Sequence, residues 1–407
     1  MRFAVAQSGG PTAAINASLA GVYEAAMELS KKFPEDPRFC SNTVLGVLHG
    51  IQGLLEEKFI DLNDSLSDPH KLALLKKTPA SALGSCRFRL PKAEQDDSLY
   101  HKIRQILEKH EIDVLLYIGG NDSMDTVAKL SKWLLEQGSP IQVIGVPKTI
   151  DNDLVGTDHT PGFGSAVKYL NMTLQEILRD CSVYQVQSVT IVEIMGRDAG
   201  WLAASSCLLR HNGESAPHFI YLPESEFTVA QFLNDVREAL KTNRCVVCAV
   251  SEGVKPPDAD LFRSGANDEF GHAYLSGIGK YLEKQVQREI GCKVRSVELN
   301  IMQRCSAHLC AYTDLIEAER CGMRAVWLAH DGQSGIMVAM KRGEHYDISY
   351  DAIPASEAAN SIRTFPQAWI TPEGNQVTDD AIDYFLPLIQ GEVYPEMSNG
   401  MPLHFQF

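Results

Sequence analysis

The stretch 141-IQVIGVPKTIDND-153 runs from an apolar segment straight into Lys148, Asp151 and Asp153. A short, continuous apolar run of this kind is typical of a strand buried on both faces, as in a parallel sheet. Opposite charges crowded at the end of such a strand are costly unless they bind something. In open α/β sheets the carboxyl ends of the strands face the ligand crevice. The stretch therefore predicts a parallel sheet whose edge holds a ligand that needs one cation and two carboxylates.

The same design recurs along the chain. Further strands are expected at residues 2–7, 113–120, 189–196 and 245–250, and amphipathic helices at 11–33, 97–112 and 123–138. Strands that alternate with helices predict an α/β fold in which helices cover both faces of a mostly parallel sheet. Two apolar runs flank a Gly/Ser turn in 326-VWLAHDGQSGIMVAMKRG-343, which predicts a hairpin. The last ~40 residues are expected to form an irregular tail with one short helix.

Length and composition limit the class of protein. The 407 residues suffice for two or three domains, and a hydrophobic content of 44% allows a large core. The net charge of -15 argues against a nucleic-acid binder or a membrane-surface protein, although a local basic cluster could still bind an anion. No stretch approaches the ~20 apolar residues of a membrane span, and the N-terminus has no apolar run of signal-peptide length. We therefore expect a cytoplasmic protein.

The cysteines agree with that expectation. Ten are scattered without paired spacing, as expected in a reducing compartment. The one CxxC pattern, Cys245 and Cys248, falls inside an apolar strand, which favours structural thiols over a metal or redox site.

Three glycine turns follow predicted strands and precede predicted helices. They are Ser8-Gly9-Gly10, Gly119-Gly120 with Asn121 and Asp122 behind it, and Gly196-Arg197. Glycine lets the backbone approach a ligand, and the free N–H groups of a helix start attract anions. Taken singly, these motifs could be ordinary turns, an N-cap, or an arginine paired with Asp198. Neither a Walker A loop nor GxGxxG is present, so the turns indicate an anion site of another kind.

The motifs GGPTAAIN, LGSCRF, GGNDS, PKTIDND, EIMGR, VSEG and MQR occur in the order seen in phosphofructokinases. The chain resembles this family over roughly residues 1 to 330, and more narrowly it resembles the pyrophosphate-dependent members. The resemblance implies two similar Rossmann-like, three-layer α/β lobes with the active site between them. It also implies Mg²⁺ and reversible transfer of a phosphoryl group to O1 of fructose 6-phosphate, a reaction of glycolysis and gluconeogenesis.

The resemblance also implies roles for individual residues. Asp151 matches the general base and Asp153 the neighbouring carboxylate that serves the base and the metal. Gly10 matches the backbone that cradles the donor, and Arg87 matches the arginine that spans the transferring group. The matched sugar-phosphate ligands are Thr149, Met195, Gly196, Arg197, Glu252 and Arg304.

The choice of phosphoryl donor depends on Asp122 and Lys148. ATP-using relatives carry glycine at the first position, which leaves room for the α-phosphate, and lack the lysine at the second. An aspartate there repels that phosphate, and the lysine can stabilise charge on pyrophosphate. Two departures from the family weaken other roles. Asn121 stands where many members have a metal-binding aspartate, and Ser188 stands where ATP-using relatives often have an arginine that reaches a neighbouring subunit.

The sequence thus favours a pyrophosphate-dependent sugar-phosphate kinase that forms a homodimer or homotetramer. The alternatives are an ATP-dependent 6-phosphofructokinase, a non-catalytic subunit that senses sugar phosphates, and a dinucleotide-binding oxidoreductase. The expected domains are a donor domain of residues 1–160 with about 310–365, a sugar-phosphate domain of residues 161–309, and a tail of residues 366–407 that packs on the lobes.

Overall fold

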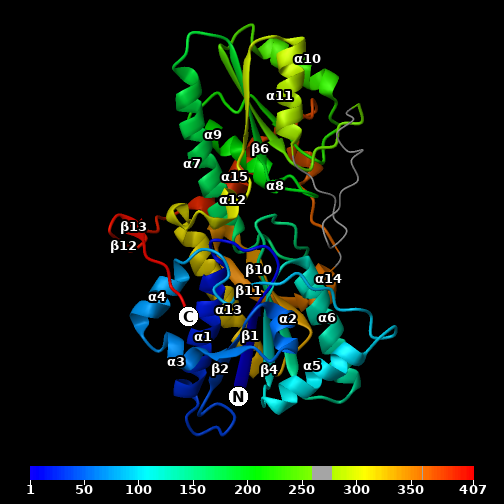
Figure 1. Ribbon diagram of the computed structural model, residues 1–407, viewed down its shortest axis with the longest axis vertical. Helices are drawn as coiled ribbons and strands as arrows, with labels where there is room; N and C mark the ends of the chain where they lie inside the picture. The colour runs from blue at the N-terminus through cyan, green and yellow to red at the C-terminus, as the bar shows by residue number, and fades with distance from the viewer. Residues whose placement is uncertain (259–276, 360) are drawn as a thin grey trace.

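In the computed structural model, which describes residues 1–258, 277–359 and 361–407, two lobes are stacked along the long axis (Figure 1). The first lobe is built on a seven-stranded sheet with the order β11-β10-β5-β4-β1-β2-β3. Its strands are β1 (Arg2–Gln7), β2 (Thr43–Val47), β3 (Phe59–Asp61), β4 (Val114–Gly119), β5 (Gln142–Pro147), β10 (Ile336–Arg342) and β11 (Ile348–Pro354). The pairs β1–β2, β1–β4, β4–β5 and β5–β10 are parallel, and only the two edge strands β3 and β11 run antiparallel to their neighbours.

Helices cover both faces of this sheet, as the apolar strands predict. Alternate residues of β1 show it directly, because Phe3 and Val5 join a core with α1 and α13, whereas Ala4 and Ala6 join a core with α5 and α6. The helices of this lobe are α1 (Ile15–Lys32), α2 (Gly50–Leu55), α3 (Leu62–Leu66), α4 (Pro69–Lys76), α5 (Ser98–Lys109), α6 (Asn121–Glu136), α13 (Tyr312–His330) and α14 (Ala355–Ala358).

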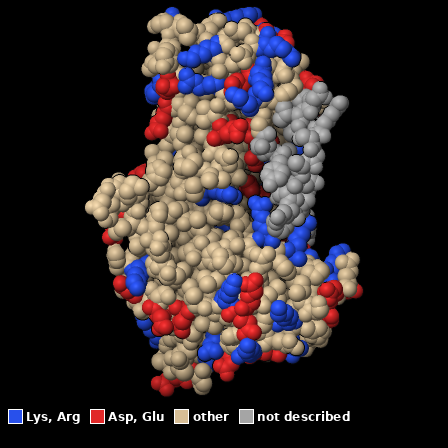
Figure 2. Space-filling view, viewed as in Figure 1, with Lys and Arg blue, Asp and Glu red and all other residues tan. Residues whose placement is uncertain are grey.

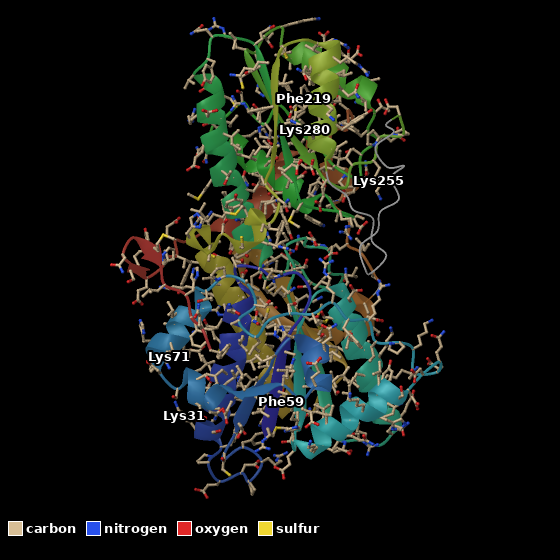
Figure 3. All side chains as sticks on the ribbon, viewed as in Figure 1. Lys31, Phe59, Lys71, Phe219, Lys255 and Lys280 are labelled. Carbon is tan, nitrogen blue, oxygen red and sulfur yellow. The ribbon has the colours of Figure 1, made fainter. Side chains whose placement is uncertain are left out.

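The second lobe is built on a four-stranded, all-parallel sheet with the order β7-β8-β6-β9. The strands are β6 (Ser188–Ile194), β7 (Phe219–Tyr221), β8 (Cys245–Ser251) and β9 (Lys293–Glu298). The helices are α7 (Phe163–Ser182), α8 (Trp201–Ala204), α9 (Leu208–His211), α10 (Val229–Ala239), α11 (Ile278–Glu289) and α12 (Met302–Cys305). Phe59 packs against a core of the lower lobe and Phe219 against a core of the upper lobe (Figure 3). This α/β architecture with mostly parallel sheets is the predicted fold class.

The hairpin predicted for residues 326–343 is wrong. Residues 326–330 form the last turns of α13, and β10 pairs instead with β11, which follows it. A short apolar run is compatible with either a strand or a buried helix, and here the helical period that begins at Tyr312 continues through it.

The C-terminal segment, residues 361–407, crosses from one lobe to the other. It holds α15 (Asp379–Phe385) and a small hairpin of β12 (Met397–Ser398) and β13 (Met401–Pro402), which was not expected in the tail. Short 3-10 turns also occur, at Ser205–Cys207, Ala307–Leu309, Glu344–Tyr346, Gln367–Trp369 and Leu386–Ile389. Among the described helices, none combines the length and apolarity needed to cross a bilayer.

Candidate active site

The carboxyl end of β5 brings Lys148 into the interior of the first lobe. Its main-chain N–H donates to Gly119 O at 3.0 Å, which ties the ends of β4 and β5 together. The side chain is only 2% exposed, and Nζ donates to Gly10 O at 2.6 Å. Burial lowers the pKa of the ammonium from 10.5 to about 8, and Asp151 opposes that shift. Lys148 is therefore a cation held at the first glycine turn.

The first two glycine turns and the Arg87 loop meet at this point. Ser8 Oγ and Ser123 Oγ lie 2.8 Å apart, which joins the turn after β1 to the turn after β4. Gly9 N–H donates to Cys86 O at 3.0 Å, so the residue before Arg87 lies against the first turn. Gly9 has φ +75°, and a Cβ there would lie 3.4 Å from Lys148 Nζ, which favours glycine at this position.

The two aspartates of the opening stretch lie in the loop after β5. Asp151 N–H donates to Thr149 Oγ1 at 3.1 Å, and burial raises the pKa of the Asp151 carboxyl. Burial, together with the charge of Asp151, raises the pKa of Asp153 to about 7. Both carboxyls are thus less acidic than ordinary aspartates, which suits a group that must accept a proton at neutral pH.

Asn121, at the start of α6, faces Asp153. Its Nδ2 donates to Asp153 Oδ2 at 2.9 Å, and its Oδ1 is buried without a hydrogen-bond partner. An orphaned amide oxygen beside a carboxylate fits Mg²⁺, which prefers oxygen ligands. In the described ranges, no group of three or more His, Cys, Asp or Glu side chains is arranged to hold a metal ion. A metal here would therefore also need oxygens from the substrate or water.

The helix-cap alternative for Asn121 and Asp122 does not hold. The N-cap of α6 is Gly120, and no side chain caps this end of the helix. Asp122 lies in the first turn, its side chain is 59% exposed, and its Oδ1 lies 3.4 Å from the Arg89 guanidinium. Arg89 is a neighbour that sequence reasoning missed, although it stands only two residues after Arg87.

In the second lobe, the loop after β6 carries Met195, Gly196 and Arg197. Gly196 has φ +140°, and a Cβ there would lie 2.7 Å from Ala199 O, so only glycine fits. Gly196 N–H donates to Glu252 Oε1 at 3.3 Å, and burial raises the pKa of Glu252 to about 7. The turn after β6 and the end of β8 are thus held together.

Gln303 supports this loop and was missed from the sequence. It is 2% exposed, and its Oε1 accepts the Met195 N–H at 3.1 Å. Its place inside the MQR motif, next to Arg304, was the available signal, but no local pattern shows which strand end a glutamine will meet.

The two lobes face each other through these strand ends. The charge of Arg197 favours the ionised forms of both Asp151 and Glu252, which opposes the effect of burial on their pKa values. The charge of Asp198 contributes to the raised pKa of Asp151 and of Asp153. Asp198 therefore belongs to the site, although the sequence suggested it only as a partner for Arg197. Figure 2 shows basic side chains gathered at the waist between the lobes.

Arg304 reaches the first lobe from α12. A Cβ on Gly10 would lie 3.2 Å from Arg304 Nη1. The positive charges of Arg304 and Arg87 both help to lower the pKa of Lys148. Burial and Arg87 lower the pKa of Arg304, whereas Asp151 and Glu252 raise it. Three cations therefore surround the first glycine turn, and one of them connects it to the second lobe.

Two α/β lobes whose facing strand ends combine three cations with paired carboxylates define a protein that binds and positions anionic substrates. Residues 2–329 match the sequence profile of the Phosphofructokinase family. The chain belongs to this family.

Individual relatives refine the comparison. A protein of Xanthomonas campestris pv. campestris, named pyrophosphate–fructose 6-phosphate 1-phosphotransferase, is 39% identical over 98% of this chain and 94% of its own. The crystal structure of pyrophosphate-dependent phosphofructokinase from Nitrosospira multiformis matches with a TM-score of 0.85 and 33% identity, covering 98% of this chain and 95% of that one. A Corynebacterium efficiens protein named ATP-dependent 6-phosphofructokinase is similar at 31% identity, over 92% of this chain and 98% of its own.

Proposed function

We propose that this chain is a phosphotransferase that reversibly moves a phosphoryl group from pyrophosphate to O1 of fructose 6-phosphate, giving fructose 1,6-bisphosphate and phosphate. The observation that carries the proposal is the position of Asp151. Asp151 lies on the same loop as buried Lys148, and the positive charges of Lys148 and of Arg197 from the facing lobe both favour its ionised form. A carboxyl with a raised pKa, placed between a donor-side cation and a sugar-side cation, suits a general base for an alcohol nucleophile.

The chemistry needs positioning and charge cancellation more than covalent help. Asp151 takes the proton from the 1-hydroxyl while O1 bonds to the transferring phosphorus and the bond to the leaving phosphate breaks. Lys148 and Arg87 offset the charge on the donor, whose phosphates lie over the backbone at Gly10. Asp122 limits the donor to two phosphates by repelling a third.

The sugar phosphate binds on the second lobe. Met195, Gly196 and Arg197 hold the sugar phosphate from the loop after β6, and Glu252 accepts hydrogen bonds from sugar hydroxyls. Thr149 completes the sugar contacts from the first lobe. Arg304 binds the 6-phosphate, and because its guanidinium lies beside Gly10, it also contacts the donor.

Asn121 and Asp153 would hold Mg²⁺, which supplies Lewis-acid charge stabilisation to the donor oxygens when bound. The unpartnered Asn121 Oδ1 supports this assignment. Because asparagine adds no charge, the affinity would depend strongly on Asp153 and on the bound donor.

The proposal also covers the domains, the location and the assembly of the protein. The donor domain comprises residues 1–160 with about 310–365, the sugar-phosphate domain residues 161–309, and the tail residues 366–407. The protein works in the cytoplasm as a homodimer or homotetramer.

One assay tests the function and its main alternatives. Initial rates of the purified chain with fructose 6-phosphate and Mg²⁺ should be substantially higher with pyrophosphate than with ATP. A preference for ATP would reassign the donor, and inactivity with both donors would support a sensing subunit. The matched variant Asp151→Ser should lose roughly 100-fold or more in kcat at little change in sugar-phosphate affinity. If it retained a tenth of the wild-type kcat, the base assignment would be wrong.

A further inference from the structure

The loop that carries both aspartates contains a residue in an unfavourable conformation. Asn152, between Asp151 and Asp153, is fully buried with φ +54°, in the left-handed region. Asparagine tolerates this region better than most residues, but the surrounding structure must still hold it there. What holds Asn152 therefore decides where its two neighbours lie.

The side chain that holds it comes from the other end of the chain. Asn152 Nδ2 donates to the Tyr384 hydroxyl at 3.0 Å, and that hydroxyl donates to Asp158 O at 2.7 Å. Tyr384 lies in α15 and is 8% exposed, and the ring packs against Trp201, Trp369 and Phe385. One hydroxyl thus joins two points of the loop between β5 and α7 that lie six residues apart.

Arg363 reinforces the same loop. Its main-chain N–H donates to Asp153 O at 2.8 Å, and its Nη1 donates to Asp158 O at 2.5 Å. Its carbonyl accepts the Trp201 Nε1–H at 2.8 Å, and its guanidinium lies 4.2 Å from the Trp201 ring centroid. Trp201 begins α8, four residues after Arg197, so Arg363 joins the loop of the two aspartates to the helix that follows the sugar-phosphate loop.

From these contacts we infer that Tyr384 is a positioning residue for phosphoryl transfer. It acts through Asn152 to fix Asp151 against the sugar hydroxyl and Asp153 beside Asn121, and Arg363 links this loop to α8, which follows the sugar-phosphate loop. The C-terminal segment then supports the catalytic loop through Tyr384 and Arg363. The inference rests on the proposed function, because it takes Asp151 as the base.

Tyr384→Phe tests the inference with the smallest change. The ring and its packing remain, but Asn152 Nδ2 loses its buried partner, whereas Asp158 O keeps the bond from Arg363 Nη1. A displaced base loop should lower kcat roughly 10- to 100-fold, because small errors in reacting geometry are costly. The KM values for both substrates should stay within about threefold, since most of the binding groups lie on the second lobe and at Gly10, and only Thr149 lies on the displaced loop.

Tyr221→Phe is the matched control. Tyr221 is 1% exposed, and its hydroxyl donates to Asp235 Oδ2 at 3.0 Å in the outer core of the second lobe. It should lose stability as Tyr384→Phe does but keep the wild-type kcat. Equal kcat losses in the two variants, or an unchanged kcat in Tyr384→Phe, would overturn the inference.

Asn152→Gly tests the route of the effect. Glycine accepts the positive φ, so this change removes the side-chain bond with little backbone strain. It should lower kcat by itself, and adding Tyr384→Phe should then cost less than about twofold. Additive losses would show that Tyr384 does not act through Asn152. If Tyr384→Phe did not fold, an unchanged kcat in Asn152→Gly would be enough to reject the inference.

Asp151→Ser separates the two proposals. If it remains active, the proposed base is wrong. If it is inactive while Tyr384→Phe turns over normally, only the positioning role fails.

Discussion

His159 gives the sharpest test of how burial sets electrostatics in this protein. The imidazole is 1% exposed and lies between two carboxylates, with Nδ1 2.8 Å from Asp158 Oδ2 and Nε2 2.7 Å from Glu317 Oε2. Tyr346 donates its hydroxyl to the other Glu317 oxygen at 2.9 Å. Burial disfavours the charge on His159, but the two carboxylates outweigh it and raise the pKa from 6.5 to about 9.

The raised pKa fixes the sign and size of the effect on stability. Each pKa unit corresponds to about 1.4 kcal/mol, so the protonated His159 stabilises the folded state by about 3 kcal/mol. This contribution is fully present below pH 6.5, because the folded state then holds a proton in a better place than the unfolded state does. It is lost as the pH rises from 6.5 through 9.

His159→Gln should therefore lower the free energy of unfolding by about 3 kcal/mol at pH 6 and by much less at pH 10. Urea unfolding of the wild type and the variant across that range measures the difference. His70→Gln is the control, because His70 lies 2.7 Å from Glu396 but both side chains are about half exposed. It should change stability by less than about 1 kcal/mol at every pH. A loss in His159→Gln that is the same at pH 6 and pH 10 would refute the argument.

Three further predictions concern the substrates. Since the pKa of Lys148 is about 8, kcat/KM for pyrophosphate should fall above that pH. Lys148→Met should lower kcat roughly 100-fold and abolish this fall at high pH. If the fall persists in the variant, another group causes it. Arg304→Ala should raise the KM for fructose 6-phosphate roughly 10-fold or more at saturating pyrophosphate, and, because its guanidinium lies beside Gly10, also the KM for pyrophosphate; an unchanged KM for the sugar phosphate would remove Arg304 from the site. Asp122→Gly, with Arg89 left unchanged, should shift the ratio of kcat/KM for pyrophosphate to that for ATP toward ATP by roughly 10-fold relative to the wild type. An unchanged ratio would show that Asp122 does not select the donor.

Much of the fold could be read from local pattern. The apolar runs at β1, β4, β5, β6 and β8 predicted buried strands, and each of these strands pairs in parallel with its neighbours. This works because a strand buried on both faces excludes polar residues over its whole length, which leaves a continuous signal. The glycine turns could also be predicted from the sequence, because the positive φ at Gly9 and Gly196 and the close backbone approach at Gly196 favour glycine over other residues.

Local pattern failed where two structures share one signal. Residues 326–330 were expected in a hairpin, but they end α13, because a short apolar run does not distinguish a strand from a buried helix. The small hairpin of β12 and β13 was missed for a related reason, since two-residue strands carry no periodicity.

Only the tertiary structure decided which distant residues meet and how strongly each is charged. Gln303 behind Met195, Arg304 over Gly10 and Tyr384 behind Asn152 are contacts between segments that no sequence period relates. The same holds for acidity. Asp122 and Asp153 are the same residue type at neighbouring strand ends, yet one is 59% exposed while burial raises the pKa of the other to about 7. A residue's identity is fixed by the sequence, but the water and charges around it are set by the packing of the whole chain, and these determine what it can do.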